Sequence, residues 1–217
     1  MNIRKWLGLF FKTLILGGLV CLVTSFIVSG GDYLDSIQAS EWLNLIGLLL
    51  WYMIYGFLFS VISQTGFFAY MFINQFGLSL FRSFWPTTQL LIVGFVVFDL
   101  IYFPYIGADG EIALYIFILI SFAILIYSIL IAYVKAKQTH KRAFVPALFF
   151  MVVLTAIEWV PGLRTGEVDH ATLMIITLLA CNTYQLLKLH HLTATDDEKK
   201  QAPRSKSPNN MDVAKSN

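Results

Sequence analysis

The sequence predicts an all-α, polytopic membrane protein with six transmembrane helices and both termini in the cytoplasm. Of its 217 residues, 58% are hydrophobic and 13% are charged, whereas a typical soluble domain is roughly 25% charged. The mean hydropathy is +0.71. A soluble domain of this length cannot bury so much apolar surface, because its exterior must face water. The composition therefore excludes an ordinary soluble enzyme, and a net charge of +2 leaves no basic footprint for nucleic acid.

Six apolar segments carry the membrane prediction, since a hydrocarbon core of about 30 Å is crossed by about 20 helical residues. They cover residues 13–31, 43–62, 83–105, 112–134, 143–160 and 171–187. The first follows Arg4, Lys5 and Lys12 and so resembles a signal peptide. Its apolar run exceeds the roughly 7–15 residues of a cleavable core, which favours a retained helix.

The second segment belongs to a stretch without charge over residues 42–81, too long for one span and short for two. Its middle, Ser63-Gln64-Thr65-Gly66, is polar and small. One interpretation is a helix over 43–62, followed by a segment over 64–82 that lies along or dips into the cytoplasmic face. The alternative is one long, tilted helix that reaches Ile73.

The distribution of Lys and Arg predicts the orientation, because cytoplasmic loops are enriched in both. With both termini inside, all but one of the 15 Lys and Arg residues face the cytoplasm, and Arg164 is the exception. The loops on the other side carry mostly Asp and Glu. We therefore expect a six-helix membrane domain over residues 1–192. The polar segment over 193–217 has no apolar periodicity and is expected to be a disordered cytoplasmic tail.

Two acids inside predicted spans are the main candidates for function, because burying an ionisable group in a membrane is costly. They are Asp99 and Glu158, both toward the outer ends of their helices. Each is a candidate for receiving a ligand, a proton or a donor from another protein. The simpler interpretation is a hydrogen bond to a neighbouring helix or to interfacial water. A basic group, Lys135, Lys137, Lys141 and Arg142, is a candidate contact for anionic lipid, although its role in orienting the protein is a sufficient explanation.

Signatures of catalysis are missing from the sequence. It contains no metalloprotease, hydrolase or nucleotide-binding motif. It also contains no nucleophilic residue with a basic residue close to it in the sequence. We therefore predict a non-enzymatic protein without catalytic, cofactor-binding or metal-binding residues. The two cysteines, Cys21 and Cys181, lie in apolar runs and are expected to be buried thiols.

One region is more specific than generic membrane sequence. It reads Ser63-Gln64-Thr65-Gly66-Phe67-Phe68-Ala69-Tyr70, then Ile73, Phe76-Gly77-Leu78 and Phe81-Arg82-Ser83, with Phe98-Asp99-Leu100-Ile101-Tyr102-Phe103 further on. This region resembles the KinB-signalling pathway activation protein family (KbaA) of spore-forming bacilli. The resemblance covers roughly residues 1–192. The chain length, the hydrophobic segments and the basic N-terminal segment are also similar to those of the family.

The resemblance implies an integral protein of the cell membrane that promotes activation of the sensor histidine kinase KinB, directly or indirectly, and so starts the sporulation phosphorelay. Membrane lipids are the other expected partners. The family supplies no catalytic residues, so the matching positions are candidates for partner contact only: Gln64, Gly66, Phe68, Tyr70, Gly77 and Arg82. Two alternatives stay open, a small transporter or ligand-binding protein that uses Asp99 and Glu158, and a membrane enzyme acting on lipid.

Overall fold

The computed structural model describes residues 3–107, 113–164 and 167–201, and everything it describes as regular structure is helical. The helices are α1 (Ile3–Val28), α2 (Gly30–Gln38), α3 (Trp42–Phe81), α4 (Trp85–Gly107), α5 (Leu114–Gln138), α6 (Phe144–Phe149), α7 (Thr155–Arg164) and α8 (Val168–Gln201). Short 3-10 turns over Arg82–Phe84 and Lys141–Ala143 precede α4 and α6, and a π-helical turn over Phe150–Leu154 joins α6 to α7. The predicted all-α class is confirmed.

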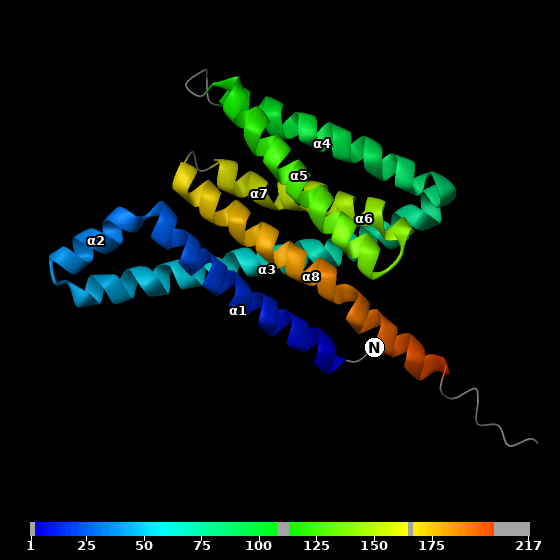
Figure 1. The fold of residues 1–217 in the computed structure, drawn as a ribbon, viewed down its shortest axis with the longest axis horizontal. Helices are drawn as coiled ribbons and strands as arrows, with labels where there is room; N and C mark the ends of the chain where they lie inside the picture. The colour runs from blue at the N-terminus through cyan, green and yellow to red at the C-terminus, as the bar shows by residue number, and fades with distance from the viewer. Residues whose placement is uncertain (1–2, 108–112, 165–166, 202–217) are drawn as a thin grey trace, which may run out of the picture.

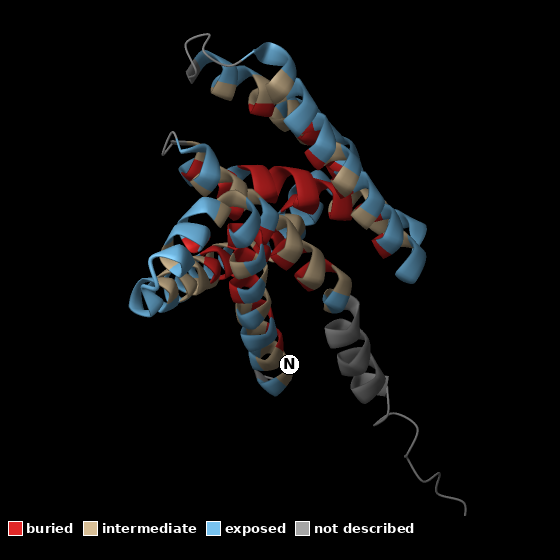
Figure 2. Cartoon of the chain, turned by 60° about the vertical axis from the view of Figure 1, so that its left-hand side comes forward, coloured by how far each residue is buried: buried red, intermediate tan, exposed pale blue. Residues whose placement is uncertain are grey.

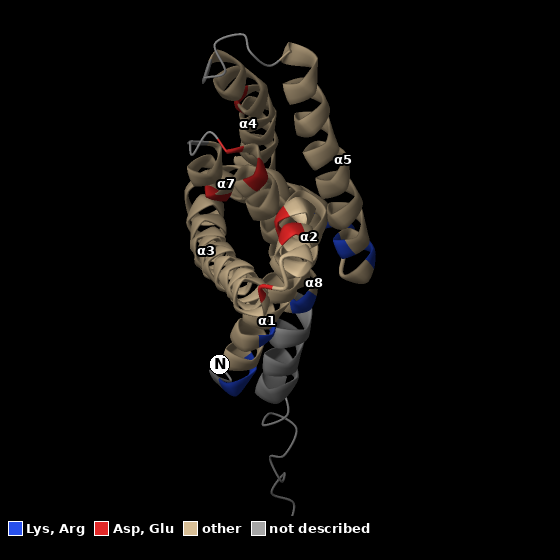
Figure 3. Ribbon diagram, turned by 90° about the vertical axis from the view of Figure 1, so that its left-hand side faces the viewer, with Lys and Arg blue, Asp and Glu red and all other residues tan. Residues whose placement is uncertain are grey.

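The long helices run alternately in opposite directions (Figure 1). The start of α1, the α3–α4 turn and the end of α8 lie toward one end of the bundle, and α2 lies at the other. Ribbon segments with Lys and Arg lie at the ends of α1, α5 and α8, away from the Asp and Glu segments of α2 and α7 (Figure 3). The predicted separation of positive and negative charge therefore appears in three dimensions.

Five helical segments of the described chain are long and apolar enough to cross a membrane. One of them is the 65-residue stretch Trp42–Ile106, which contains both α3 and α4. Counted separately, these give six hydrophobic helices, because the π-helical turn makes α6 and α7 one continuous rod. These lengths and compositions indicate a multi-pass membrane protein.

The stretch over residues 42–81 forms one unbroken helix of 40 residues, about 60 Å long at 1.5 Å per residue. The interpretation in which 64–82 leaves a helix ending at 62 is therefore wrong. The alternative of one long helix is right in kind, but the helix passes Ile73 and ends at Phe81. The polar residues in its middle need no break, because Ser63 and Gln64 are buried against neighbouring helices. The chain turns at Arg82, which has a positive φ of 50°.

The rod formed by α6, the π-helical turn and α7 is the centre of the molecule. Every residue from Ala147 to Ala156 is buried, which makes this segment the most continuous red region in Figure 2. By contrast, most of α3, α4 and α5 exposes large apolar side chains, as expected of surfaces that face lipid. At the other end of the chain, α8 continues to Gln201. Residues 193–201, expected to belong to the tail, are thus helical, and 202–217 lie outside the described residues.

Glycines allow α1 and α3 to cross at backbone contact. A Cβ atom added to Gly56 would lie 2.5 Å from the carbonyl oxygen of Gly17 and 2.7 Å from Cα of Gly18. A Cβ at Gly17 would in turn lie 2.8 Å from the Gly56 oxygen. Small residues of this kind let membrane helices pack closely without a hydrophobic driving force. The crossing places Ser60 of α3 against α1, with its Oγ donating to the carbonyl oxygen of Thr13 at 2.9 Å.

We predict that Gly56→Ala lowers the free energy of unfolding by about 1–3 kcal/mol, because the added methyl group overpacks the crossing. The measurement is denaturant unfolding of the purified protein in detergent. Gly47→Ala is the matched control on the same helix, since nothing lies within 4 Å of a Cβ there. It should leave stability unchanged or raise it by up to about 1 kcal/mol through helix propensity. Equal effects of the two substitutions would contradict the close crossing.

Candidate functional site

A buried hydrogen-bond network joins α3, α7 and α8, and its centre is the side chain of Asn182. The amide nitrogen Nδ2 of Asn182 donates to Oγ1 of Thr155 at 2.9 Å and to Oε2 of Glu158 at 2.8 Å. Its oxygen Oδ1 accepts a 2.6 Å bond from Oγ of Ser63. Asn182, Thr155 and Ser63 are fully buried. One side chain therefore satisfies polar groups from two other helices in the apolar interior.

The network extends along α8 and α3. Nε2 of Gln185, one turn after Asn182, donates to Oγ of Ser63 at 2.6 Å. On α3, Nε2 of Gln64 donates to Oγ of Ser60 at 3.2 Å, and Ser60 links the network to α1 as described above. The small polar residues in the middle of α3 thus form interhelical contacts rather than a loop.

Glu158 is the ionisable member of the network. It is 6% exposed, and its second oxygen, Oε1, has no hydrogen-bond partner. Oε1 lies against Gly66 of α3, where any Cβ atom would overlap it. Gly66 is therefore required sterically, because its missing side chain provides the space for the carboxyl group. Residues 66 and 158, both selected from the sequence, meet in the structure.

The helical geometry explains why α7 presents two groups to Asn182. Thr155 and Glu158 are three residues apart, a spacing that places side chains on one face of a helix. They directly follow the π-helical turn over Phe150–Leu154. A π-helical turn contains one extra residue, so it rotates the side chains that follow it around the helix axis. Such turns are frequent at functional sites. The turn therefore sets the rotation at which both polar groups face α8.

The other positions of the predicted contact motif divide into buried and exposed residues. Tyr70 is 5% exposed, and its hydroxyl donates to the carbonyl oxygen of Pro146 at 3.1 Å. Gly77 is buried under the indole ring of Trp85. Phe68 is 50% exposed, and Arg82 is exposed at the α3–α4 turn. Among the motif residues, Phe68 and Arg82 are thus the ones presented to a partner in this conformation, while Gln64, Gly66, Tyr70 and Gly77 make intramolecular contacts.

The remaining candidates lie apart from this network. Asp99 is half-buried on α4 and contributes no hydrogen bond to it. Lys135 points inward, is 6% exposed, and donates from Nζ to the carbonyl oxygen of Leu186 at 2.6 Å. The surface part of the predicted lipid patch consists of Lys137, Lys141 and Arg142.

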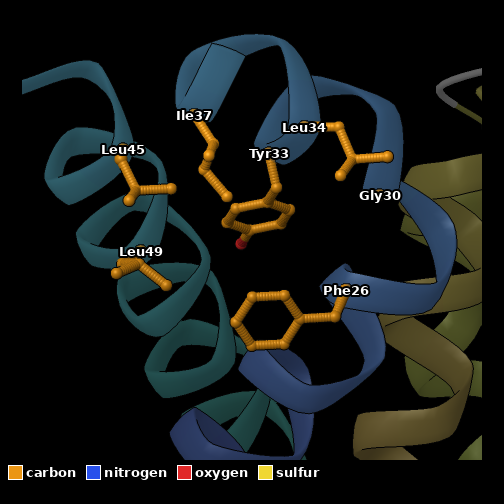
Figure 4. Close-up of a pocket in the computed structure, with 7 residues that line it drawn as sticks. All are labelled: Phe26, Gly30, Tyr33, Leu34, Ile37, Leu45 and Leu49. Carbon is orange, nitrogen blue, oxygen red and sulfur yellow. The ribbon is translucent and has the colours of Figure 1, made fainter. Parts of the chain in front are cut away.

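An apolar cavity of about 530 Å³ lies between α1, α2 and α3 (Figure 4). The ring of Tyr33 stands in it 4.6 Å from that of Phe26. Its hydroxyl shares a 2.8 Å hydrogen bond with Ser25, and burial raises the pKa of Tyr33. Leu34, Ile37, Leu45 and Leu49 complete much of the wall, so this cavity offers no polar group free to select a ligand.

Asn182, Gln185 and Thr155 were not among the predicted site residues, because they are not ionisable and the prediction rested on ionisable groups in the membrane spans. The available signal was a pair of amide side chains three residues apart within the apolar run over 171–187. Chemically, the site can bind a proton or an ion, and it can stabilise a contact between helices. Among the described residues, no three His, Cys, Asp or Glu side chains converge to hold a metal ion.

Comparison with known proteins gives two matches. Residues 17–192 match the model of a protein family, KbaA, described as KinB-signalling pathway activation in sporulation. The KinB-signaling pathway activation protein of Bacillus subtilis (strain 168) is 38% identical over 198 residues, which cover 89% of this chain and 100% of the relative. No solved structure shows a significant match.

We predict that Ser63→Ala and Asn182→Ala are each destabilising and that their effects are not additive. A double-mutant cycle on the purified protein, measured by denaturant unfolding, should give a coupling free energy of about 0.5–1.5 kcal/mol. Thr65→Ala with Asn182→Ala serves as the control pair, because Thr65 is exposed on α3 and bonds only within its own helix. A coupling of zero for the first pair would contradict the network.

Proposed function

This chain belongs to the KbaA family, and from that membership we propose that it is a non-enzymatic membrane protein that promotes activation of the sensor histidine kinase KinB. Activated KinB then feeds the sporulation phosphorelay. The observation that carries the proposal is the family match over residues 17–192, which covers α2 to α7 completely and most of α8, together with the second half of α1. With almost no mass outside its hydrophobic helices, the protein acts through helix–helix contact and through lipid.

We propose that the contact surface for KinB is an aromatic stripe on the second half of α3, formed by Phe68, Phe72 and Phe76. These side chains are 50%, 71% and 63% exposed. A spacing of four residues places them on one helix face, and the rings of Phe72 and Phe76 stack with centroids 6.4 Å apart. Aromatic side chains are enriched where protein surfaces bind partners.

The length of α3 supports this location. A helix of about 60 Å fits a hydrocarbon core of about 30 Å only with a steep tilt or with one end outside. In the predicted orientation, the second half of α3 lies toward the cytoplasm, beside the Lys- and Arg-bearing ends of α1 and α8. A transmembrane kinase must carry its signal across that boundary. Binding the active form of KinB more tightly than the inactive form would shift the kinase toward activity.

Anionic lipid is the second proposed contact. Lys137, Lys141 and Arg142 are exposed around the connection between α5 and α6. Basic residues at a membrane boundary are attracted to anionic headgroups, each by about 1 kcal/mol. This attraction would fix the depth of the bundle and hence the height at which α3 meets the kinase.

The aromatic stripe can be tested by complementation in Bacillus subtilis lacking its own relative, in a strain whose sporulation depends on KinB. Replacing Phe68, Phe72 and Phe76 together by Ala should lower sporulation frequency at least about tenfold, because loss of an aromatic contact of 1–2 kcal/mol already weakens binding by that order. Co-purification of KinB with the variant should fall in parallel.

The matched control replaces three phenylalanines on α4, Phe95, Phe98 and Phe103, which are 63%, 56% and 64% exposed. This triple variant removes a similar apolar area and should sporulate normally. Normal sporulation and KinB recovery with the α3 variant would disprove the contact surface. If deleting the gene has no effect on KinB-dependent sporulation, the proposed function itself fails.

The proposed orientation can be tested by cysteine labelling, since both native cysteines are buried. We expect that a cysteine at His140, in the connection after α5, reacts with a membrane-impermeant maleimide only after the cells are opened. A cysteine at Gln38, at the end of α2, should react in intact cells. Both positions are exposed. The opposite pattern would reverse the topology and place the aromatic stripe on the outer face.

A further inference from the structure

Glu158 is an acid without a counter-charge. Only 6% of its surface is exposed. One carboxyl oxygen accepts a single hydrogen bond, from Asn182, and the other accepts none. No Lys, Arg or His of the described chain pairs with it. An isolated carboxylate is very costly to bury unless a positive charge or a proton accompanies it. The geometry therefore leaves one negative charge to be neutralised by something other than these side chains.

A mostly apolar cavity of about 430 Å³ lies between α3, α7 and α8, near the polar network. Ile62 and Pro161 line it. Ile62 is one helical turn from Gly66, and Pro161 is one turn from Glu158, but neither Gly66 nor Glu158 lines the cavity. Toward the other end of its wall, the ring of His170 packs against Tyr55 and Phe59 with centroids 5.4 and 5.5 Å away.

The chemistry of the surroundings selects the charge of the ligand. The polar group bonded to the carboxyl is the neutral amide of Asn182, which is bonded in turn to the hydroxyl groups of Ser63 and Thr155. Divalent cations in proteins take several charged or strongly donating ligands, and no such group of three exists in the described chain. A single carboxylate bonded to one neutral amide matches one positive charge.

We propose that Glu158 binds one monovalent cation, a proton or an alkali-metal ion, in the buried interior where α3, α7 and α8 meet. Binding neutralises the carboxyl group and allows it to remain against Gly66, holding α7 to α3. Release leaves a buried charge at this contact and weakens it. The proposal concerns cation binding only and does not depend on the proposed role with KinB.

Other titratable groups must be separated from Glu158 in any test. Cys181 on α8 interacts with it electrostatically. The remaining titratable groups on the described parts of the helices packed against α7 are Tyr52, Tyr55 and Tyr70 on α3, Asp99, Tyr102 and Tyr105 on α4, and Asp169, His170, Tyr184 and Lys188 on α8. Asp99 is the useful comparison, because it is also an acid in an apolar helix but lies outside the network.

The test measures the melting temperature of the full-length protein in lipid nanodiscs in two series. One varies pH in choline chloride, over roughly pH 5–9. The other replaces choline with sodium or potassium at constant pH and ionic strength. A cation that binds the folded protein stabilises it by mass action, so a tenfold increase above its dissociation constant should raise the melting temperature by about 3–5 °C. A response to pH alone identifies a proton, and a response to sodium or potassium identifies an alkali-metal ion.

The Glu158→Gln side chain is neutral at any pH. In this variant, the change in melting temperature should disappear in the series in which the wild type shows it. Asp99→Asn should respond like the wild type. An unchanged response in Glu158→Gln, or a flat wild type in both series, would overturn the proposal. If Glu158→Gln does not fold, infrared difference spectra of the wild type decide. A carboxyl band must then change across the same titrations in the wild type and in Asp99→Asn, and its absence would equally overturn the proposal.

Discussion

The interior of this bundle depends on the hydrogen bonds of one amide, that of Asn182. In a membrane, apolar side chains gain little by leaving lipid for protein, so helices associate through close packing and through polar groups that must be satisfied. Asn182 reaches Ser63 on α3 and both Thr155 and Glu158 on α7. Removing it would take a hydrogen-bond partner from polar groups of two other helices, α3 and α7. The position of α7 between α3 and α8 follows from this requirement.

The bundle also depends on glycines, because polar contacts between helices form only where the backbones can approach each other. Gly17 and Gly56 bring α1 onto α3, which allows Ser60 to reach the Thr13 carbonyl. Gly66 makes room for the carboxyl group of Glu158. The polar network and the small residues are therefore parts of one arrangement, and each fails without the other. The π-helical turn before Thr155 adds the rotation that aligns α7 with both.

Helix α3 connects this interior to the surface proposed for KinB. Ser63, Gln64 and Gly66 lie on its buried side, and the exposed ring of Phe68 follows half a turn later. A helix without Pro or charge between these positions is stiff, so a change at the carboxyl contact of Glu158 would move or release the aromatic stripe as a unit. Such coupling needs two states of α3 that the two sites favour differently. If both proposals hold, cation binding within the bundle and kinase activation share this helix.

The sequence by itself determined the membrane class, the number of hydrophobic helices and their approximate ends, because an apolar segment of about 20 residues has few alternatives in lipid. It also indicated Glu158 and Gly66 as separate candidates, without their contact with each other. Only the tertiary structure decided that α3 continues through its polar centre, that Tyr70 faces inward while Phe68 faces outward, and that Lys135 is buried rather than part of the surface patch. It also brought in Asn182 and Gln185, whose importance comes from partners more than a hundred residues away in the chain. The physical reason is that a polar residue in an apolar helix has no preferred face until another helix supplies its hydrogen-bond partner.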